Sequence, residues 1–366
     1  MIFTALVIAA CFLVTFTLLP LWRCEAWWVR SLDFPRMQLT LIALGLLLLE
    51  CWLLDWSRPQ TWGLCLVTLF CFAYQACWIF PYTKLFPVEV KSTKNTDDRR
   101  VISILTANVL TPNRNAKGLI DLVRENKPDI LVTLESDNWW QSKLDALQPD
   151  FPYSVKCPKD NLYGMHVYSR LPLAESQIKY LVEADIPSIH ALVTLPAGTN
   201  VRVHFLHPAP PSPTENAASS ERDAELIIVA KSVADAGIPA IVAGDLNDVA
   251  WSETTRLFRK ISGLLDPRVG RGMFNTFHAG YWFIRWPLDH LFHSDHFTLK
   301  RISRLRRFGS DHFAIFTELM LETRSDIEQR GLDADSEDKV LADAKTNQKG
   351  ISKHEVPQPE KTADRH

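Results

Sequence analysis

Cysteine is scarce outside the first eighty residues of this 366-residue chain. Six of the seven cysteines lie before residue 80, and only Cys157 occurs in the remainder. One cysteine has no partner for an intramolecular disulfide, so a disulfide-stapled domain is excluded for the larger part of the chain. No Gly-x-Ser-x-Gly sequence is present, and no base lies near Cys157 in the sequence. Neither a serine nor a cysteine nucleophile motif is therefore available.

Net charge is also small, at −2 for the whole chain, which favours no particular class of partner. Charge is almost absent from three apolar segments within the first eighty residues: Ile2–Pro20, Leu39–Leu54 and Trp62–Pro81. Each approaches the ~20 residues that cross a bilayer as a helix. A secretory signal peptide followed by buried core helices is the alternative, but no Lys or Arg precedes Arg23, whereas a signal peptide begins with a basic region.

Tryptophan and tyrosine are concentrated at the ends of these segments, as in an interfacial aromatic belt. The belt residues are Trp22, Trp27, Trp28, Trp52, Trp56, Trp62, Trp78 and Tyr82. We therefore predict a membrane region over residues 1–85 with three transmembrane helices, and a multi-pass protein of the bacterial inner membrane type. Glu50, near the end of the second span, is expected to reach the interface rather than to line a proton path.

The distribution of basic residues bears on orientation. The first loop holds Arg23, Arg30 and Arg36, the second only Arg58, and a basic cluster from Lys84 to Arg100 follows the third span. The positive-inside rule then places the first loop and the C-terminal domain in the cytoplasm. The margin is only a few charges, so the side of the membrane is left open.

After the apolar region, residues 86–100 are polar and are predicted to form a short linker. Residues 101–321 have a globular pattern in which β-branched runs such as "VISILTANV", "DILVTLE", "VRVHFLH" and "IPAIVAGD" alternate with helical patterns at Lys117–Asn126 and Glu221–Ala234. Such alternation indicates an α/β fold. Residues 322–366 are charged and poor in aromatics, and we predict a disordered polar tail.

Polar groups stand at the ends of several predicted strands or in the adjoining turns. They are Asn108, Glu135, His207, Asp245, Asn247, Asp289, Asp311 and His312. Each alone also fits a structural role: a turn residue, a helix cap, a loop histidine, an Asx turn, or an Asp289–Arg285 ion pair. Their joint occurrence is harder to explain structurally.

Together these side chains suit the hydrolysis of phosphate esters. A carboxylate such as Glu135, with an amide oxygen such as Asn108, offers the hard ligands that Mg²⁺ prefers. An imidazole such as His312, held by Asp289, can transfer a proton or stabilise charge on phosphorus-bound oxygen. Asp245 can orient an attacking water, and Asn247 can donate to a phosphate oxygen.

The ordered series "TAN", "LVTLE", "YGMHVYSRLPL", "FLHPAPP", "GDLND", "PLDHLF" and "GSDHF" resembles the endonuclease/exonuclease/phosphatase superfamily. That superfamily includes deoxyribonuclease I, exonuclease III-type enzymes, neutral sphingomyelinases and inositol polyphosphate 5-phosphatases. The resemblance spans about Val101–Leu321 and implies a four-layer α/β sandwich, two packed β-sheets flanked by helices, with the site at one edge. It also implies Mg²⁺, or Mn²⁺, as the cofactor.

Carried over by position, the resemblance makes Glu135 the principal metal ligand, with Asn108 beside it and Asp311 as a further acid. Asp245 would position the attacking water, Asn247 would bind phosphate, and Asp289 would orient the catalytic His312. His207 stands where exonuclease III-type enzymes have tyrosine. This difference disfavours an abasic-site repair role. Ser169 and Arg170 would be structural.

Two further stretches each allow two interpretations. The basic stretch Lys300–Phe308 fits either a solvated strand and loop or a rim that attracts phosphate. The aromatic stretch Phe277–Pro287 fits either core or a platform for a base or an acyl chain. The leading prediction is a membrane-anchored, Mg²⁺-dependent phosphodiesterase or phosphatase with a phospholipid or phosphorylated-lipid substrate and no obligate protein partner. A membrane-tethered nuclease and a catalytically weak binding module are the alternatives.

Overall fold

The computed structural model describes residues 1–322, 329–348 and 354–357 and divides into two compact units. The apolar helical unit comprises Met1–Pro87 with two short segments, Pro211–Ser219 and Gly270–Gly272. The sheet unit comprises Val88–Pro210, Ser220–Val269 and the described residues from Met273 onward.

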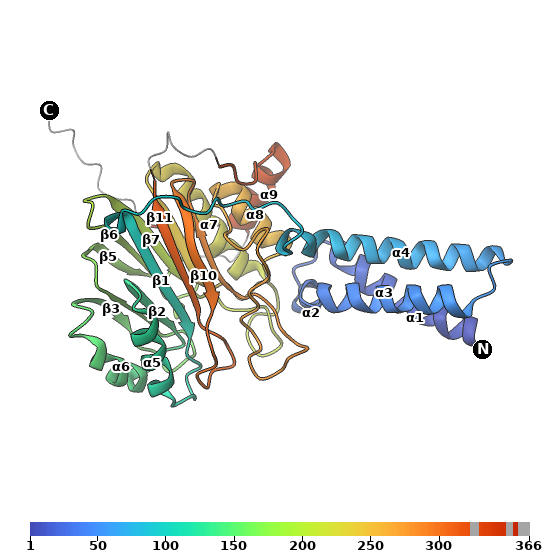
Figure 1. Ribbon diagram of the computed structural model, residues 1–366, viewed down its shortest axis with the longest axis horizontal. Coiled ribbons are helices and arrows are strands. Elements are labelled where there is room, and N and C mark those ends of the chain that lie inside the picture. Colours follow the sequence, from blue (N-terminus) through green and yellow to red (C-terminus); the bar gives the residue numbers. More distant parts are fainter. Residues whose placement is uncertain (323–328, 349–353, 358–366) are drawn as a thin grey trace. The chain divides into compact units, whose positions relative to one another are not determined.

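Three long helices dominate the apolar helical unit (Figure 1): α1 (Ile2–Leu18), α3 (Arg36–Leu53) and α4 (Pro59–Ile79). The short helices between and after them are η1 (Leu19–Leu21), α2 (Trp27–Arg30), η2 (Ser31–Asp33) and η3 (Phe80–Tyr82). Each long helix, with η1 extending the first and η3 the third, is long and apolar enough to cross a membrane. Most of their large apolar side chains are exposed, as lipid-facing surfaces require.

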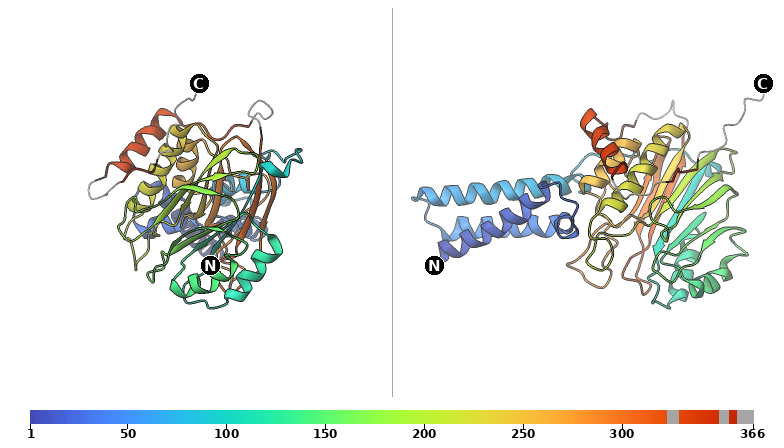
Figure 2. Two further views of the ribbon diagram at one scale, coloured as in Figure 1. Left: turned by 90° about the vertical axis from the view of Figure 1, so that its left-hand side faces the viewer. Right: turned by 180° about the vertical axis from the view of Figure 1, so that it is seen from behind.

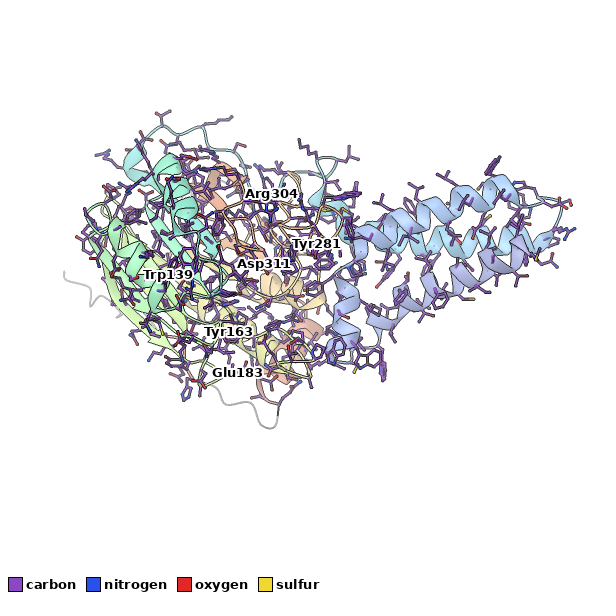
Figure 3. All side chains as sticks on the ribbon, turned by 90° about the horizontal axis from the view of Figure 1, so that it is seen from below. Trp139, Tyr163, Glu183, Tyr281, Arg304 and Asp311 are labelled. Atoms are coloured by element: carbon purple, nitrogen blue, oxygen red, sulfur yellow. The ribbon has the colours of Figure 1, made fainter. Side chains whose placement is uncertain are left out.

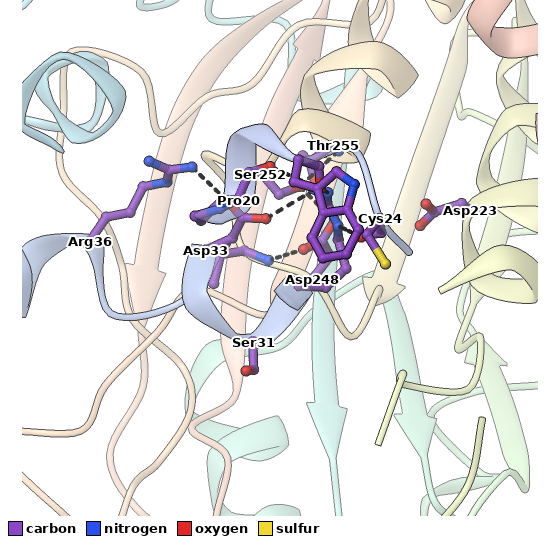
Figure 4. A network of polar contacts seen from close by, with 12 residues as sticks. Pro20, Cys24, Ser31, Asp33, Arg36, Asp223, Asp248, Ser252 and Thr255 are labelled. Carbon is purple, nitrogen blue, oxygen red and sulfur yellow. Dashed lines mark hydrogen bonds and ion pairs between the residues drawn. The ribbon is translucent and has the colours of Figure 1, made fainter. Parts of the chain in front are cut away.

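Polar side chains are buried between these helices. Thr68 of α4 donates its hydroxyl to Glu50 Oε1 of α3 at 2.8 Å, and both side chains are fully buried. The expectation that Glu50 reaches the interface is therefore wrong: a hydroxyl on the neighbouring helix provides an internal hydrogen bond. Near the start of α3, Arg36 donates to Gln75 and to Asp33 (Figure 4).

Two β-sheets form the centre of the sheet unit (Figure 1). The six-stranded sheet has the order β10-β11-β1-β2-β4-β3, with β1 at Val101–Asn108, β2 at Ile130–Leu134, β3 at Tyr153–Cys157, β4 at Met165–Ser169, β10 at Phe297–Arg304 and β11 at Ile315–Leu321. The five-stranded sheet has the order β5-β6-β7-β8-β9, with β5 at Leu173–Lys179, β6 at Ser188–Thr194, β7 at Asn200–Leu206, β8 at Ala240–Asp245 and β9 at Asp289–His293.

Apolar side chains from the inner faces of both sheets pack into one core, which includes Ile104, Val132, Val203 and Ile241. Two further cores lie on the outer faces, beneath the helices that flank the sheets in Figure 2. Helices α5 (Ala116–Asn126) and α6 (Asn138–Leu144) cover the six-stranded sheet, and α7 (Ser220–Ala236) and α8 (Glu253–Ser262) cover the five-stranded sheet. Helix, sheet, sheet and helix form the predicted four-layer α/β sandwich.

Strand direction explains why polar side chains distant in sequence meet at one edge. Strands β1 and β2 are parallel, as are β7 and β8, so the carboxyl ends of each pair lie together. Strand β11 runs antiparallel to β1, and β9 antiparallel to β8, so their first residues lie at the same ends. The residues after β2 and β7 and before β11 therefore converge with the end of β8.

Two predictions about the flanks of the sheet unit need correction. The expected linker is partly integrated into the sheet: Ser92 forms a parallel bridge with Leu299, and Val90 is fully buried. The expected disordered tail contains a helix, α9 (Ser336–Thr346), which packs against α7 and α8. The remainder of that prediction, at 323–328, 349–353 and 358–366, lies outside the described residues.

Candidate active site

At the edge of the six-stranded sheet, Asn108 ends β1 and Glu135 directly follows β2. Asn108 Nδ2 donates to Glu135 Oε1 at 2.7 Å and to Asp245 Oδ2 at 3.2 Å, while its Oδ1 accepts from the backbone N–H of Leu110 at 3.0 Å. The Asn108 amide therefore links carboxylates from the two sheets. Glu135 has a φ of 59°, an uncommon left-handed conformation for a side chain of this size.

The sequence after β8 forms a tight turn that presents Asp245 and Asn247. Asn247 has a φ of 51°, and its N–H donates to Asp245 Oδ1 at 3.0 Å, which is the geometry of an Asx turn. Its side-chain Nδ2 donates to the carbonyl of Pro208 at 2.9 Å, joining this turn to the residues after β7. The structural interpretation of "GDLN" as an Asx turn is correct, and the same turn brings Asp245 to the shared edge.

His312 lies between two carboxylates. Its Nδ1 is 2.7 Å from Asp289 Oδ2, and its Nε2 is 3.5 Å from Asp245 Oδ2. Burial alone would lower the pKa of His312, but the charges of Asp289 and Asp245 raise it to about 10. His312 is therefore cationic at neutral pH. Asp289 pairs with this imidazole, and the alternative Asp289–Arg285 pair is not formed, since Arg285 donates to the Tyr281 carbonyl instead.

A second histidine, His207, directly follows β7 and has the opposite charge state. Burial lowers its pKa to about 4, despite the nearby charge of Asp245, so the ring is neutral at pH 7. Its Nδ1 is buried and has no hydrogen-bond partner among the described residues. The ring of Tyr163 lies 5.3 Å away between centroids, from the turn before β4 (Figure 3).

Asp311 is half-buried beside these groups (Figure 3). Ser310 Oγ donates to the carbonyl of Asn108 at 2.8 Å and accepts the N–H of His312 at 3.0 Å. This hydroxyl fixes the "SDH" turn onto the end of β1. Asp311 and Asp245 both act on the Glu135 carboxyl by charge repulsion, so the three acids are close together.

The residues at this edge fit a divalent cation. Glu135 Oε2 is buried without a hydrogen-bond partner among the described residues. Burial, more than the nearby acids, raises the pKa of Glu135 to about 7, and a bound cation would offset that cost. Glu135 and Asp311 supply the oxygen ligands that Mg²⁺ or Mn²⁺ takes. Asn108 as a ligand stays a prediction, because its Oδ1 is engaged by Leu110.

Ligand atoms of Asp245, Asp289 and His312 also lie within 4.8 Å of one another, a spacing that could hold a metal ion. The 2.7 Å contact between His312 Nδ1 and Asp289 Oδ2 is that of a charge-assisted hydrogen bond. Two ligands of one ion stand ~3 Å apart or more, since each is about 2.1 Å from the ion. We therefore interpret this trio as a proton-linked group beside the metal site.

Two features of the site, Tyr163 and Arg222, were not predicted from sequence, and a third, Phe277, belongs to the aromatic stretch for which two interpretations were given. Tyr163 lies in the quoted "YGMHVYSRLPL". No feature of its position in the sequence predicts that its ring lies beside that of His207. Arg222, buried on α7, donates to the Asn247 carbonyl at 2.8 Å. Phe277 packs its ring 4.9 Å from that of His312, so the start of the aromatic stretch forms a wall of the site.

Two of the five cations in the basic stretch Lys300–Phe308 pair with carboxylates. Lys300 pairs with Glu318 at 2.9 Å and with Asp98 at 3.2 Å, and Arg306 pairs with Glu125 at 2.8 Å. This favours the structural interpretation for these two cations. Arg304 differs, since it donates to the carbonyl of Asn275 and lies over the ring of Phe313.

The model of the Endonuclease/Exonuclease/phosphatase family matches residues 105–312, more than half of the 366-residue chain. The chain belongs to this family. It is accordingly a phosphoric ester hydrolase of the metal-dependent kind, and the acids and histidine at the shared edge suit that chemistry. No curated protein sequence matches it.

Solved structures share the fold of the sheet unit. The catalytic domain of human Nocturnin, solved with a bound sulfate anion, aligns with a TM-score of 0.51 and 18% identity over 62% of this chain and 96% of that chain. D. rerio TDP2, solved with a single-strand DNA product, aligns with a TM-score of 0.50 and 17% identity over 60% of this chain and 98% of that chain. At these identities the likeness establishes the fold and leaves the substrate open.

Proposed function

We propose that this family member is a membrane-anchored hydrolase that uses Mg²⁺ or Mn²⁺ to cleave phosphate esters of phospholipids. The observation that carries the proposal is that a buried carboxylate oxygen and a cationic imidazole lie at the same edge of the sheets. Glu135 offers a buried oxygen without a hydrogen-bond partner among the described residues, and His312 is held cationic between Asp289 and Asp245. A phosphate ester between them meets positive charge and a water-orienting carboxylate together.

Asp245 is suited to orient and deprotonate the attacking water. Burial raises its pKa, but opposing effects, of which the charge of His312 is the largest, hold the pKa below its usual range. Asp245 is thus an acceptor at neutral pH, and two N–H donors, from Asn247 and Asn108, fix its orientation. A water bound to this carboxylate is held by a group that cannot rotate freely.

His312 and His207 serve different tasks because their protonation differs. The His312 imidazolium can donate Nε2–H to a phosphate oxygen that gains charge during attack. Neutral His207 can donate one hydrogen bond to the substrate without adding charge. Asn247 keeps one N–H of its side chain for phosphate, since the other is given to Pro208. The metal, when bound, neutralises a phosphate oxygen and the leaving group.

The phospholipid assignment is supported by the three apolar helices of the same chain. A catalytic unit tethered to a bilayer meets lipid headgroups at high local concentration. Which side of the membrane it faces stays a prediction, with the basic residues of the first loop favouring the cytoplasm.

Hydrolysis of nucleic acid is the second candidate. D. rerio TDP2, which shares the fold, was solved with a single-strand DNA product. The near-neutral charge of this chain, −2, weighs against the broad basic face of most nucleases. A binding module without activity is disfavoured, since a retired site would be expected to lose members of its acid, amide and histidine set.

The test uses the full chain in nanodiscs, with phospholipid, sphingomyelin-type lipid, single-stranded and plasmid DNA, and bis(p-nitrophenyl) phosphate. Each is assayed with Mg²⁺, with Mn²⁺ and with EDTA. His312→Ala is compared with His296→Ala, a histidine in the turn before β10 that bonds Ser294. We expect metal-dependent phospholipid hydrolysis that His312→Ala abolishes and His296→Ala leaves unchanged. DNA hydrolysis alone, with the same dependence on His312, would establish the nuclease.

A further inference from the structure

The aromatic stretch forms a hairpin whose base is part of the active-site wall. Phe277 and Trp286 pair across it, and the His278 N–H donates to the Ile284 carbonyl at 3.1 Å. The Phe313 N–H donates to the Thr276 carbonyl at 2.9 Å, which attaches the hairpin to the residue after His312. Any surface that holds the hairpin tip is thereby held next to the catalytic histidine.

The tip of this hairpin exposes three consecutive aromatic side chains. Tyr281 is 52% exposed, Trp282 82% and Phe283 53%. The other exposed large apolar residues of the described sheet unit are scattered singly: Val88, Tyr153, Leu162 and Val340. Isolated apolar residues are normal at a protein surface, but a contiguous aromatic group marks an interaction site. The rings contact one another, with Trp282 and Phe283 centroids 5.6 Å apart.

Two guanidinium groups, those of Arg285 and Arg304, accompany the aromatic tip; Figure 3 labels Arg304 and Tyr281. Arg285 donates to the Tyr281 carbonyl at 2.8 Å, and Arg285 and Arg304 both lie over the ring of Phe313, at 5.2 and 4.5 Å from its centroid. Among the described residues, the printed partners of both guanidinium groups are backbone carbonyls and the Phe313 ring rather than carboxylates. Exposed aromatics with cations behind them match the layering of a bilayer surface, where acyl chains lie beneath phosphate groups.

The chain itself limits what this tip can reach. Residues 83–90 connect η3, which ends at Tyr82, to the sheet-paired segment at Lys91, and this length spans at most ~30 Å. Within the apolar helical unit, Gly270 donates its N–H to the carbonyl of Pro81 at 2.8 Å, and the chain continues from Gly270 into the hairpin. A bilayer is therefore the partner always present within reach of the tip.

We propose that the Tyr281–Phe283 tip inserts its aromatic side chains into the interfacial layer of the bilayer, with Arg285 and Arg304 at the lipid phosphates. This docking would deliver a lipid phosphate ester to His312, and in that respect alone it rests on the proposed function. The occupant is a phospholipid surface, and a nucleobase stacked on Trp282 is the competing outcome of the test.

The first experiment detects contact without using activity. The full chain carries p-benzoylphenylalanine in place of Trp282 and is photolysed in phosphatidylglycerol/phosphatidylethanolamine nanodiscs. The matched control carries it in place of Tyr153, which pairs with Ser169 at the far end of β4. We expect phospholipid adducts at position 282 at least ten-fold above those at position 153. Equal or absent lipid adducts at the two positions would overturn the docking.

The second experiment links the tip to turnover. For Trp282→Ser/Phe283→Ser, the ratio of bilayer-phospholipid to bis(p-nitrophenyl) phosphate hydrolysis should fall at least ten-fold, and Tyr153→Ser should leave this ratio unchanged. Lipid adducts at position 282 in a chain that hydrolyses only the soluble ester would support docking and overturn the lipid substrate. Crosslinking of position 282 to single-stranded DNA without lipid adducts would overturn docking and make the tip a base platform.

Discussion

Lys345 of α9 donates to Asp223 Oδ2 of α7 at 2.7 Å, and both side chains are nearly excluded from solvent. Asp223 Oδ1 in turn accepts from Arg222 Nη2 at 2.8 Å. Arg222 donates to the carbonyl of Asn247 at 2.8 Å and lies 3.5 Å from Asp248 Oδ2. Asp248 also accepts the hydroxyl of Ser252 (Figure 4). A helix near the C-terminus therefore orients the turn that carries Asp245.

We predict that Lys345→Met lowers kcat about ten-fold while KM for the substrate changes less than two-fold. Without the Lys345 ammonium group, the buried Asp223 carboxylate competes for Arg222. This weakens the hydrogen bond from Arg222 to the Asn247 carbonyl. Lys231→Met is the matched control, because Lys231 bonds Asp343 of the same helix from a more exposed position. Lys345→Arg should restore most of the activity. Equal loss in the two Met variants would mean that α9 acts only through overall stability.

Much of the active site could be predicted from sequence because its members stand at strand ends. Asn108, Glu135, His207 and Asp245 each interrupt an apolar β-branched run, which local patterning makes visible. Their convergence follows from strand direction and was supplied by the resemblance to a known family. The contacts of the Asn108 amide could not be predicted, since its neighbours come from two sheets.

Helix α9 was missed for a different reason. The helix buries little apolar surface: Ala342 is its buried apolar residue in the cluster with Ile227 and Leu257. The sequence of the helix therefore has no clear hydrophobic periodicity. Its position is set by ion pairs that only the tertiary structure reveals, such as Lys260 with Asp338 at 2.7 Å. One local signal was available: Asp335 and Asp338 have the spacing of a capping box, and the structure forms one.

Replacing Asp289 should change the pH dependence of turnover. The folded pKa of His312, about 10, lies above its ordinary 6.5, so the imidazolium form persists until the pH rises through 10. Asp289→Asn removes the largest of the charges that raise this pKa, so the alkaline limb of kcat should move at least one pH unit lower. The measurement is kcat against pH from 6 to 10.5 with bis(p-nitrophenyl) phosphate. An alkaline limb at the wild-type position would contradict the assignment.

The same charge contributes to stability with a definite sign. The His312–Asp289 interaction is fully present below pH 6.5 and is lost as the pH rises through about 10. The wild-type thermal midpoint in EDTA should therefore fall more between pH 7 and 10 than that of Asp289→Asn. Parallel curves for the two proteins would argue that the pair is not charged in the folded state.

Glu135→Gln should raise the Mg²⁺ concentration for half-maximal activity at least ten-fold, because a neutral amide is a weaker ligand than carboxylate. Since burial raises the Glu135 pKa to about 7, protons compete with the metal, and the wild-type midpoint should increase as the pH falls from 8 to 6. The variant should lose that dependence. Glu125→Gln, an exposed partner of Arg306, is the control. Indistinguishable Mg²⁺ titrations for all three proteins would remove Glu135 as a ligand.

Gly244, the residue before Asp245, tests whether the site depends on close strand packing. Its φ is 147°, and a Cβ there would lie 1.9 Å from the carbonyl oxygen of Leu206 on β7. Gly244→Ala should therefore cost at least ~3 kcal/mol in unfolding free energy, since backbone must move. Gly237→Ala is the control, with a φ of 65° but open space around its Cβ, and should cost only ~1 kcal/mol. Thermal unfolding of the full chain, followed by tryptophan fluorescence, measures both.

If the two variants lost equal stability, backbone conformation alone would explain Gly244, and β7 and β8 would tolerate the separation that alanine requires. The expected inequality instead means that the sheet places Asp245 only when residue 244 has no side chain.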